Sequence, residues 1–405
     1  MNLKNEAISI KDEIINLRRE FHMNPELGFE EYKTSKTIKE YLDKEGIRYE
    51  SYAKTGVCGI IRGNLEKNKD RVIGLRSDID ALPIEENNKC EYTSTIKGKM
   101  HACGHDGHAA ILLGVAKILN RNRDLFGGTV KVIFEPAEET VGGARYMIEE
   151  GVLNNPKVDI VCGLHLDENI NCGQVQVKFG AVNAASNPFK IEVMGVGGHG
   201  AYPASAIDPI VISSNIINSL QNIVSREVNP LNSAVITVGS IHGGTGANII
   251  PEKVTLTGII RTLNKEDRHL VTKRVTEIAK GIALTLRGKV KIEIEESYPM
   301  LINDKNSVNK LRNAAIKIIG EENVLEQEYP HMGVESFAYF ANEIPSVFYF
   351  LGCRNEEKGI IHPAHSSLFD IDEDALIVGI AIQCQMVLDY LTNWRNNINL
   401  IRWGK

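Results

Sequence analysis

The densest group of chemically reactive residues is the segment His-Ala-Cys-Gly-His-Asp-Gly-His at residues 101–108. Cys103 and His105 are two positions apart, so both side chains point to the same side of an extended segment. A thiolate beside an imidazole suits zinc, and cobalt, nickel or manganese are also accepted when carboxylates complete the site. We therefore expect a metal site here, with His101 and His108 in supporting structural roles. A polar start of a helix is the alternative interpretation.

Further polar residues directly follow predicted strands. The β-rich run at 71–77 leads into two aspartates, the strand at 129–134 into two glutamates, and the strand at 158–164 into a histidine. A loop after the predicted strand at 346–351 adds one more imidazole. Because ligands of open α/β sheets bind at the carboxyl ends of strands, we expect these side chains to converge on one crevice. The residues are Asp78, Asp80, Glu138, Glu139, His165 and His365.

Five side chains from these groups are too many for one tetrahedral zinc ion. They fit two divalent ions that share one bridging ligand and one bridging water. Two ions lower the pKa of the shared water and polarise a substrate carbonyl, and the remaining carboxylate, Glu138, then acts as general base. The five candidate ligands are Cys103, His105, Glu139, His165 and His365.

Two other motifs are weaker. The segment 195–200 has the G-x-G-x-x-G spacing of a dinucleotide site, but Pro203 interrupts the start of the required helix. The acidic residue that should follow is also missing, because none lies between Asp208 and Glu227. A cysteine nucleophile at Cys103 would need a histidine oriented by a carboxylate, and it leaves four other polar positions without a role.

The order of predicted elements indicates the α/β class with an insertion. Near both ends of the chain strands alternate with helices, which indicates a mostly parallel sheet flanked by helices. Between them the predicted order is β-α-β-β-α-β, that of a ferredoxin-like module with an antiparallel sheet. We therefore expect a discontinuous catalytic domain at residues 1–186 and 299–405. The inserted α+β domain, expected at 187–298, would serve as lid and dimerisation domain.

Composition argues against several classes of protein. The 405 residues include 46 basic and 52 acidic ones, a net charge of −6, whereas a duplex-binding surface needs a basic excess; we expect no nucleic-acid partner. No apolar run approaches the roughly 18–20 residues of a membrane span, so we expect no membrane partner, and the N-terminus lacks the apolar core of a signal peptide. Seven scattered cysteines, an odd number, indicate reduced thiols in the cytoplasm.

At these motifs the sequence resembles the bimetallic aminoacylase and carboxypeptidase-type metallopeptidases. It is most similar to the amidohydrolase branch of hippurate hydrolases, auxin-conjugate hydrolases and N-acetyl-diaminopimelate deacetylases. The resemblance runs from Arg-Arg-Glu-Phe-His-Met-Asn-Pro-Glu at 18–26 to Phe-Asp-Ile-Asp-Glu at 369–373. It implies that Cys103 bridges the two metal ions and that Glu138 is the general base. It favours His365 over His362, because the family's ligand lies seven residues before the first acid of its Asp-Glu-Asp run.

The resemblance implies roles for further residues. Asp78 and Asp80 match the family's Asp-x-Asp-Ala-Leu-Pro strand end and lie behind the ligands, with Asp80 in support of catalysis. The histidine that matches His199 acts from the partner subunit, and the residues that match Asn248 and Arg261 contact substrate. A neutral donor suits a developing oxyanion, and an arginine suits a free carboxylate. We therefore expect a homodimer formed through the inserted domain.

One position departs from the family pattern. The branch usually shows Gly-x-Glu-Asp-Phe where this chain has Gly-Val-Glu-Ser-Phe at 333–337, so Ser336 replaces a carboxylate near the substrate pocket and the substrate is not carried over. We expect an enzyme that cleaves the amide bond of N-acyl-amino acids with two divalent ions, zinc or manganese before cobalt or nickel. A metallo-carboxypeptidase or dipeptidase acting on short peptides is the alternative. A protein that binds metal or an amino acid without turnover is a third hypothesis.

Overall fold

The computed structural model describes residues 2–392, which divide into two compact units. The larger unit takes residues 2–180, 302–328 and 339–392, and the smaller unit takes residues 181–301 and 329–338. The smaller unit thus includes a short segment that follows the expected insert in the sequence. The last part of the expected catalytic domain, residues 393–405, lies outside the described residues.

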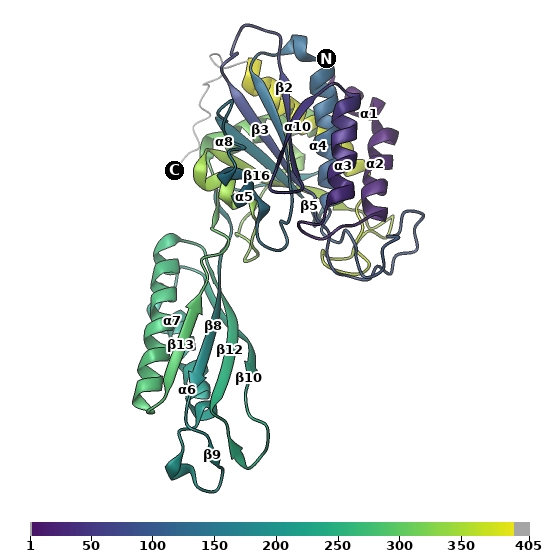
Figure 1. Ribbon diagram of the computed structural model, residues 1–405. Coiled ribbons are helices and arrows are strands. Elements are labelled where there is room, and N and C mark those ends of the chain that lie inside the picture. Colours follow the sequence, from purple (N-terminus) through teal and green to yellow (C-terminus); the bar gives the residue numbers. More distant parts are fainter. Residues whose placement is uncertain (1, 393–405) are drawn as a thin grey trace. The chain divides into compact units, whose positions relative to one another are not determined.

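The larger unit is built on one eight-stranded sheet (Figure 1). Its four central strands run parallel, and antiparallel pairs lie toward the edges. In sheet order the strands are β1 (Arg48–Tyr52), β2 (Gly56–Arg62), β4 (Thr129–Glu135), β3 (Val72–Asp78), β5 (Ile160–Asn171), β16 (Ser346–Arg354), β6 (Val175–Val177) and β15 (Val324–Glu326). β3 and β4 are buried along their whole length, as expected for strands covered on both faces. The predicted α/β class is confirmed.

The central helix of this unit is α4 (His105–Arg121), whose residues from His105 to Leu119 are all buried. It packs on β3 and against α2 (Lys11–Met23) and α10 (Asp374–Thr392). Gly114 allows the close approach of α10, because a Cβ at that position would lie 2.5 Å from Cδ1 of Ile380. The remaining helices outside the insert are α1 (Leu3–Ser9), α3 (Tyr32–Lys44), α5 (Gly143–Glu149), α8 (Lys305–Ile319) and α9 (Phe337–Glu343).

α10 has the length and composition of a helix that could cross a membrane, with a mean hydropathy of 1.6. The sequence alone predicts no such stretch, because Gln383, Gln385 and Asp389 interrupt the apolar run. In the structure 67% of the stretch is buried inside the protein, which is the environment of a core helix.

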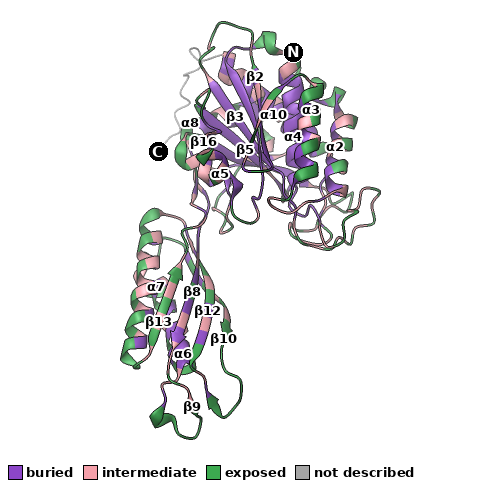
Figure 2. Cartoon of the chain, viewed as in Figure 1, coloured by how far each residue is buried: buried purple, intermediate pink, exposed green. Residues whose placement is uncertain are grey.

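The smaller unit has the ferredoxin-like order that the sequence predicts. Its elements are β8 (Ala185–Met194), α6 (Pro209–Asn222), β10 (Ala234–His242), β12 (Lys253–Thr262), α7 (Lys265–Thr285) and β13 (Lys289–Ile294). The strands form an antiparallel sheet in the order β10-β12-β8-β13, and α6 and α7 pack against it. The apolar core of this unit lies between its helices and its sheet. Many of its other residues are exposed to solvent (Figure 2).

A two-stranded ribbon lies beyond this sheet, formed by β9 (Gly198–His199) and β11 (Ile249–Ile250). Gly198 and His199 of the glycine-rich segment 195–200 form β9. A short 3-10 turn at Pro203–Ser205 follows, and α6 begins only at Pro209. The helix that a dinucleotide site requires at the last glycine is therefore not there, in agreement with the expectation from Pro203.

Candidate metal centre

The five side chains expected to bind metal meet in the larger unit, although they come from distant parts of the chain. They form two overlapping groups whose ligand atoms lie within 4.8 Å of one another. One group is Cys103, His105 and His165, and the other is Cys103, Glu139 and His365. Cys103 Sγ lies 3.4 Å from His165 Nε2, and His365 Nε2 lies 3.2 Å from Glu139 Oε1. Because Cys103 belongs to both groups, it has the position that a ligand shared by two ions requires.

The turn at Gly104 sets the directions of Cys103 and His105. Its φ of 87° lies in the left-handed region, and a Cβ there would lie 3.3 Å from Cβ of Leu166. Glycine adopts this conformation without steric cost and leaves room for the neighbouring side chain. α4 begins directly afterwards at His105, so the thiol and the imidazole flank the point where loop becomes helix.

The two glutamates follow β4, as predicted, whereas His165 lies inside β5. The strand was expected to stop before His165, but pairing with β16 extends it. Glu138 is 8% exposed, and one of its carboxylate oxygens lies within 4.8 Å of ligand atoms of His105 and Glu139. The candidate general base is therefore next to the candidate ligands.

His365 stands in an irregular loop with a left-handed φ of 64°. Its backbone N–H donates a hydrogen bond to the carbonyl oxygen of Ala102 at 2.7 Å. This bond ties the C-terminal loop to the segment before Cys103, so two ligands more than 250 residues apart are connected through the backbone. His362, the rejected alternative, belongs to none of the ligand groups found among residues 2–392.

Asp80 positions two of the candidate ligands. Its Oδ1 lies 3.2 Å from His105 Nδ1, which also lies 3.0 Å from the Asp80 carbonyl oxygen. Its Oδ2 accepts the backbone N–H of Glu139 at 2.9 Å. The carboxylate thereby turns Nε2 of His105 toward the centre and holds the backbone of Glu139. These contacts are those of a residue that positions ligands, in line with a supporting role.

Among the described residues, the buried ligand atom His105 Nε2 has no hydrogen-bond partner, and it lies 3.9 Å from Glu139 Oε1. A buried polar atom left in this state costs about 1–3 kcal/mol, and coordination to a cation removes that cost. Imidazole, thiolate and carboxylate are also the donors that zinc and its first-row neighbours accept. The donor set therefore fits two divalent ions.

His108 could form a third metal-ligand group with Asp78 and His105. The lone pair of its ring, however, already accepts a hydrogen bond. Its Nε2 accepts the backbone N–H of Leu166 at 2.8 Å, so the ring proton is on Nδ1, 2.5 Å from Asp78 Oδ1. Burial lowers the pKa of His108 to about 4, which keeps the ring neutral. Asp78 Oδ2 in turn accepts a hydrogen bond from Arg76 Nη1 at 2.8 Å. These contacts use the lone pair of His108 and tie its ring to Asp78.

Opposite charges accumulate in the centre before any ion binds. Burial disfavours the imidazolium of His105, but Asp78 and Asp80 raise its pKa well above the usual value. Burial disfavours the carboxylate of Glu139, yet the hydrogen bond from His365 and the charge of His105 lower its pKa. Burial, with Glu139 adding to it, raises the pKa of the Cys103 thiol well above its usual range. An ion bound here would therefore displace protons from Cys103 and His105, whereas Glu139 already favours its carboxylate form.

A buried ion-pair network supports the segment that carries the ligands. Arg18 Nε lies 2.8 Å from Asp106 Oδ2, and His22 Nδ1 lies 2.7 Å from the same oxygen. Arg18 also contacts Asp370 at 2.8 Å. The network joins α2 to the first turn of α4. The resembled stretch at 18–26 contains Arg18 and His22, but nothing in their spacing predicts that Asp106 is their partner.

The residues predicted in the insert belong to the smaller unit. His199 and Asn248 are neighbours, because Gly200 N–H donates to the Asn248 carbonyl oxygen at 2.7 Å. His199 Nδ1 accepts the N–H of Ala201 at 3.1 Å, so the neutral ring carries its proton on Nε2. His199 and Asn248 are both exposed.

Arg261 lies near the opposite end of β12 from this ribbon. It is half-buried, and burial lowers its pKa. Its Nη1 donates to Ser186 Oγ at 2.5 Å, and within residues 2–392 it forms no ion pair with a carboxylate. A half-buried guanidinium that lacks a carboxylate partner among the described residues is suited to an anionic ligand.

Ser336 is fully buried in the segment of residues 329–338 that joins the smaller unit. Its neighbour Glu335 is also buried and accepts the N–H of Phe337 at 2.8 Å. The serine that replaces the family's aspartate is therefore a buried side chain, not an exposed one.

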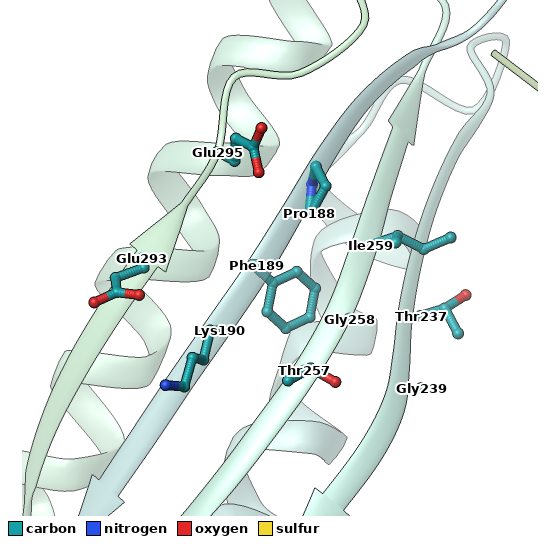
Figure 3. A pocket seen from close by; sticks show the side chains of 10 residues that line it. All are labelled: Pro188, Phe189, Lys190, Thr237, Gly239, Thr257, Gly258, Ile259, Glu293 and Glu295. Atoms are coloured by element: carbon teal, nitrogen blue, oxygen red, sulfur yellow. The ribbon is translucent and has the colours of Figure 1, made fainter. Parts of the chain in front are cut away.

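The smaller unit also has a pocket of about 550 Å³ on its sheet (Figure 3). Lys190, Glu293 and Glu295 point from its rim, and Phe189 lies over Gly258 between β8 and β12. A Cβ at Gly258 would lie 2.4 Å from Cζ of Phe189, so the glycine makes room for the ring. None of the metal-ligand groups found among the described residues includes a residue of this pocket.

The known proteins that this chain is similar to are peptidases and hydrolases of amino-acid conjugates. Residues 74–389 match the model of "Peptidase family M20/M25/M40". The chain is 39% identical over 393 residues to thermostable carboxypeptidase 2 of Saccharolobus solfataricus, covering 96% of this chain and 98% of the relative. It is 40% identical to IAA-amino acid hydrolase ILR1-like 2 of Arabidopsis thaliana, covering 94% and 85%. A crystal structure of a dinuclear metal-binding peptidase from Bacillus subtilis superposes with a TM-score of 0.81 at 33% identity, covering 95% and 99%.

Fold and centre together define a metal-dependent hydrolase of amide bonds. The chain belongs to peptidase family M20/M25/M40, whose model matches most of its length. The resemblance seen in the sequence is thereby confirmed.

The two overlapping ligand groups predict how metal content responds to mutation. Dialysed wild-type protein should hold two divalent ions per chain, and His165→Ala and His365→Ala should each lose one. Cys103→Ala should lose both, because its sulfur lies in both groups. Metal analysis of the dialysed variants measures this.

The matched control for this series is His362→Ala, which should keep two ions because it removes an imidazole from the same loop but not from either group. Loss of a single ion in Cys103→Ala would contradict a shared thiolate.

Proposed function

We propose that the protein is an N-acyl-amino-acid amidohydrolase. The observation that carries the proposal is the position of Glu138, a buried carboxylate beside five side chains that fit two divalent ions. Zinc or manganese is the metal that we infer, with cobalt and nickel as alternatives. The relatives include a hydrolase named for amino-acid conjugates, which supports this substrate class.

The reaction needs a base, an acid and a donor for the oxyanion. The two ions, when bound, activate water and polarise the acyl carbonyl. Glu138 accepts the proton of the water whose oxygen adds to the acyl carbon. It returns that proton to the amide nitrogen as the C–N bond breaks, which yields a carboxylate and a free amine. His199 Nε2–H and Asn248 are the neutral donors that we propose for the oxyanion and the substrate.

Arg261 is the residue that we propose for the α-carboxylate of the substrate. Its guanidinium is half-buried and has no carboxylate partner within residues 2–392, so an anionic ligand would supply the missing charge. An arginine binds a carboxylate through two parallel hydrogen bonds, which fixes the orientation of the substrate.

The spacing inside the smaller unit supports a homodimer. From Lys253 to Arg261, β12 spans about 26 Å at ~3.3 Å per residue, and His199 lies beyond the Lys253 end. That distance exceeds the length of a small N-acyl-amino acid. If both His199 and Arg261 act on one substrate, a second copy of the chain must supply one of them. We therefore propose that His199 acts across a dimer formed through the insert.

A carboxypeptidase or dipeptidase is the alternative function. One relative is named a carboxypeptidase, and a short peptide also presents a free α-carboxylate to Arg261. We further infer that the protein works in the cytoplasm, where its seven free cysteines stay reduced, and that neither nucleic acid nor a membrane is a partner.

A turnover panel tests the proposed function. Metal-loaded protein is incubated with N-acyl-amino acids and with dipeptides, and release of free amino acid is measured. Faster release from N-acyl-amino acids supports the amidohydrolase, and faster release from dipeptides supports the alternative. Undiminished activity in demonstrably metal-free protein would refute both, and no release from any substrate would support the hypothesis of a binding protein.

The two adjacent glutamates should respond differently to the same substitution. Glu138→Gln should lower kcat by about 10²–10⁴-fold with metal content near wild type, because the amide cannot accept the proton. Glu139→Gln should lower metal occupancy, because it removes a charged ligand. Steady-state kinetics combined with metal analysis measures both effects. The opposite pattern would exchange their roles.

Removal of Arg261 should affect only substrates with a free carboxylate. Arg261→Ala should raise KM for N-acyl-amino acids by about 10- to 100-fold, the loss of a charge-assisted pair. KM for the corresponding methyl esters should change little, since an ester has no charge for the arginine to bind. Equal effects on acids and esters would assign Arg261 a structural role.

Subunit mixing tests whether His199 acts across the dimer. His199→Ala and Glu138→Gln proteins should each be inactive, whereas a mixed dimer contains one intact site. After full subunit exchange the mixture should recover about a quarter of wild-type activity, because half of the dimers are mixed and each holds one working site of two. No recovery after proven exchange would mean that each chain builds its own site.

A further inference from the structure

Glu31 is a buried carboxylate without a role in the proposed reaction. It is 0% exposed and each oxygen accepts one hydrogen bond. The backbone N–H of Ala137 lies 2.8 Å from Oε1, and the hydroxyl of Thr55 lies 2.6 Å from Oε2. Glu31 precedes the first turn of α3, but its side chain forms no capping hydrogen bond to that helix. Within residues 2–392 no lysine or arginine forms an ion pair with it, so its carboxylate is used for hydrogen bonding alone.

Ala137 is the residue directly before Glu138. Its φ of 55° lies in the left-handed region, which is unfavourable for alanine unless the surrounding structure holds it. Gly28 packs against the same residue, because a Cβ at Gly28 would lie 3.0 Å from both Cα and Cβ of Ala137. The segment 28–31 therefore supports this strained residue through its backbone and through the Glu31 carboxylate.

The amide on the other side of Glu138 is held in a similar way. The N–H of Glu139 donates to Asp80 Oδ2 at 2.9 Å. The backbone N–H groups of the residues directly before and after the candidate base, Ala137 and Glu139, are thus each bound by a buried carboxylate from another part of the chain. Asp80 also contacts His105, whereas Glu31 holds Ala137 and Thr55, neither of which is a candidate ligand.

We propose that Glu31 is a positioning residue for amide hydrolysis, acting through the Ala137 amide to hold the backbone from which Glu138 reaches the reacting water. The inference rests on the proposed function, in which Glu138 is the base. A general base works only within hydrogen-bond reach of its proton, and a misplacement of about 1 Å can cost ~10²-fold in rate. The loop after β4 contains no helix or strand. Its own turn hydrogen bonds end on the Ala137 carbonyl oxygen, and the two carboxylates add the constraint on the N–H side of Ala137 and Glu139.

Three variants separate this role from packing. Glu31→Leu removes the acceptor for the Ala137 amide and should lower kcat by about 10- to 100-fold, with KM changed less than about threefold. Glu31→Gln can accept from Ala137 through its carbonyl oxygen and donate to Thr55, so its kcat should stay within about threefold of wild type. Thr55→Val is the matched control, because it deletes only the other hydrogen bond of Glu31 and should leave kcat near wild type.

Two further measurements do not depend on turnover. Metal content should stay at the wild-type value in all three variants, in contrast to Asp80→Asn, which also disturbs His105 and should bind metal less tightly. Hydrogen–deuterium exchange of the segment 135–142 should become faster in Glu31→Leu and remain slow in Glu31→Gln and Thr55→Val.

The outcomes separate the positioning role from the proposed function. Faster exchange with a kcat defect confined to Glu31→Leu supports the inference. Unchanged exchange in Glu31→Leu, loss of metal in that variant, or an equal kcat defect in Thr55→Val overturns it. If wild-type protein turns over none of the panel substrates, the proposed function fails. Faster exchange confined to Glu31→Leu would then still support the conclusion that the hydrogen bond from Ala137 to Glu31 stabilises the loop.

Discussion

A buried cluster of thiol, imidazole and carboxylate groups is stable only when each lone pair meets a cation or a proton, and the larger unit is organised around this requirement. The start of α4, the loop after β4, the strand β5 and a C-terminal loop each bring one or two ligand atoms to the same place. Without an ion, charged histidines offset the carboxylates, and His105 Nε2 has no hydrogen-bond partner among the described residues. Two cations would supply that partner and replace the protons.

Around the ligands lies a set of hydrogen bonds that fixes their directions. Asp80 orients His105 and the backbone of Glu139, and the ring of His108 bonds to Asp78 and to the Leu166 amide. Such contacts matter because a ligand held in one rotamer loses little entropy when the ion binds. They also explain how Asp78 and Asp80 can be buried, because each of these carboxylates bonds to a partner near the ligands.

The smaller unit contributes a different kind of constraint. Its sheet is antiparallel, and the separation between the ribbon with His199 and the end of β12 with Arg261 is set by the length of the strand. The family contains enzymes named as carboxypeptidases and as amino-acid conjugate hydrolases, which implies that the same centre serves different amides. Choice among substrates would then depend on residues outside the centre, and Arg261, which we propose for the substrate carboxylate, is one of them.

Much of the centre could be predicted from the sequence, because ligand types, glycines and strand ends are local features. The pair Cys103 and His105 has metal-ligand spacing, and the hydrophobic periodicity of the insert is enough to predict β-α-β-β-α-β. The roles of His108, Asp106 and Glu31 were decided only by the tertiary structure. His108 differs from His105 because the Leu166 amide, 58 residues away, occupies its lone pair. Glu31 looks like the solvated start of a helix until folding places it against Ala137, 106 residues further along the chain. Pairing over such separations depends on how the elements pack together, which no local pattern encodes.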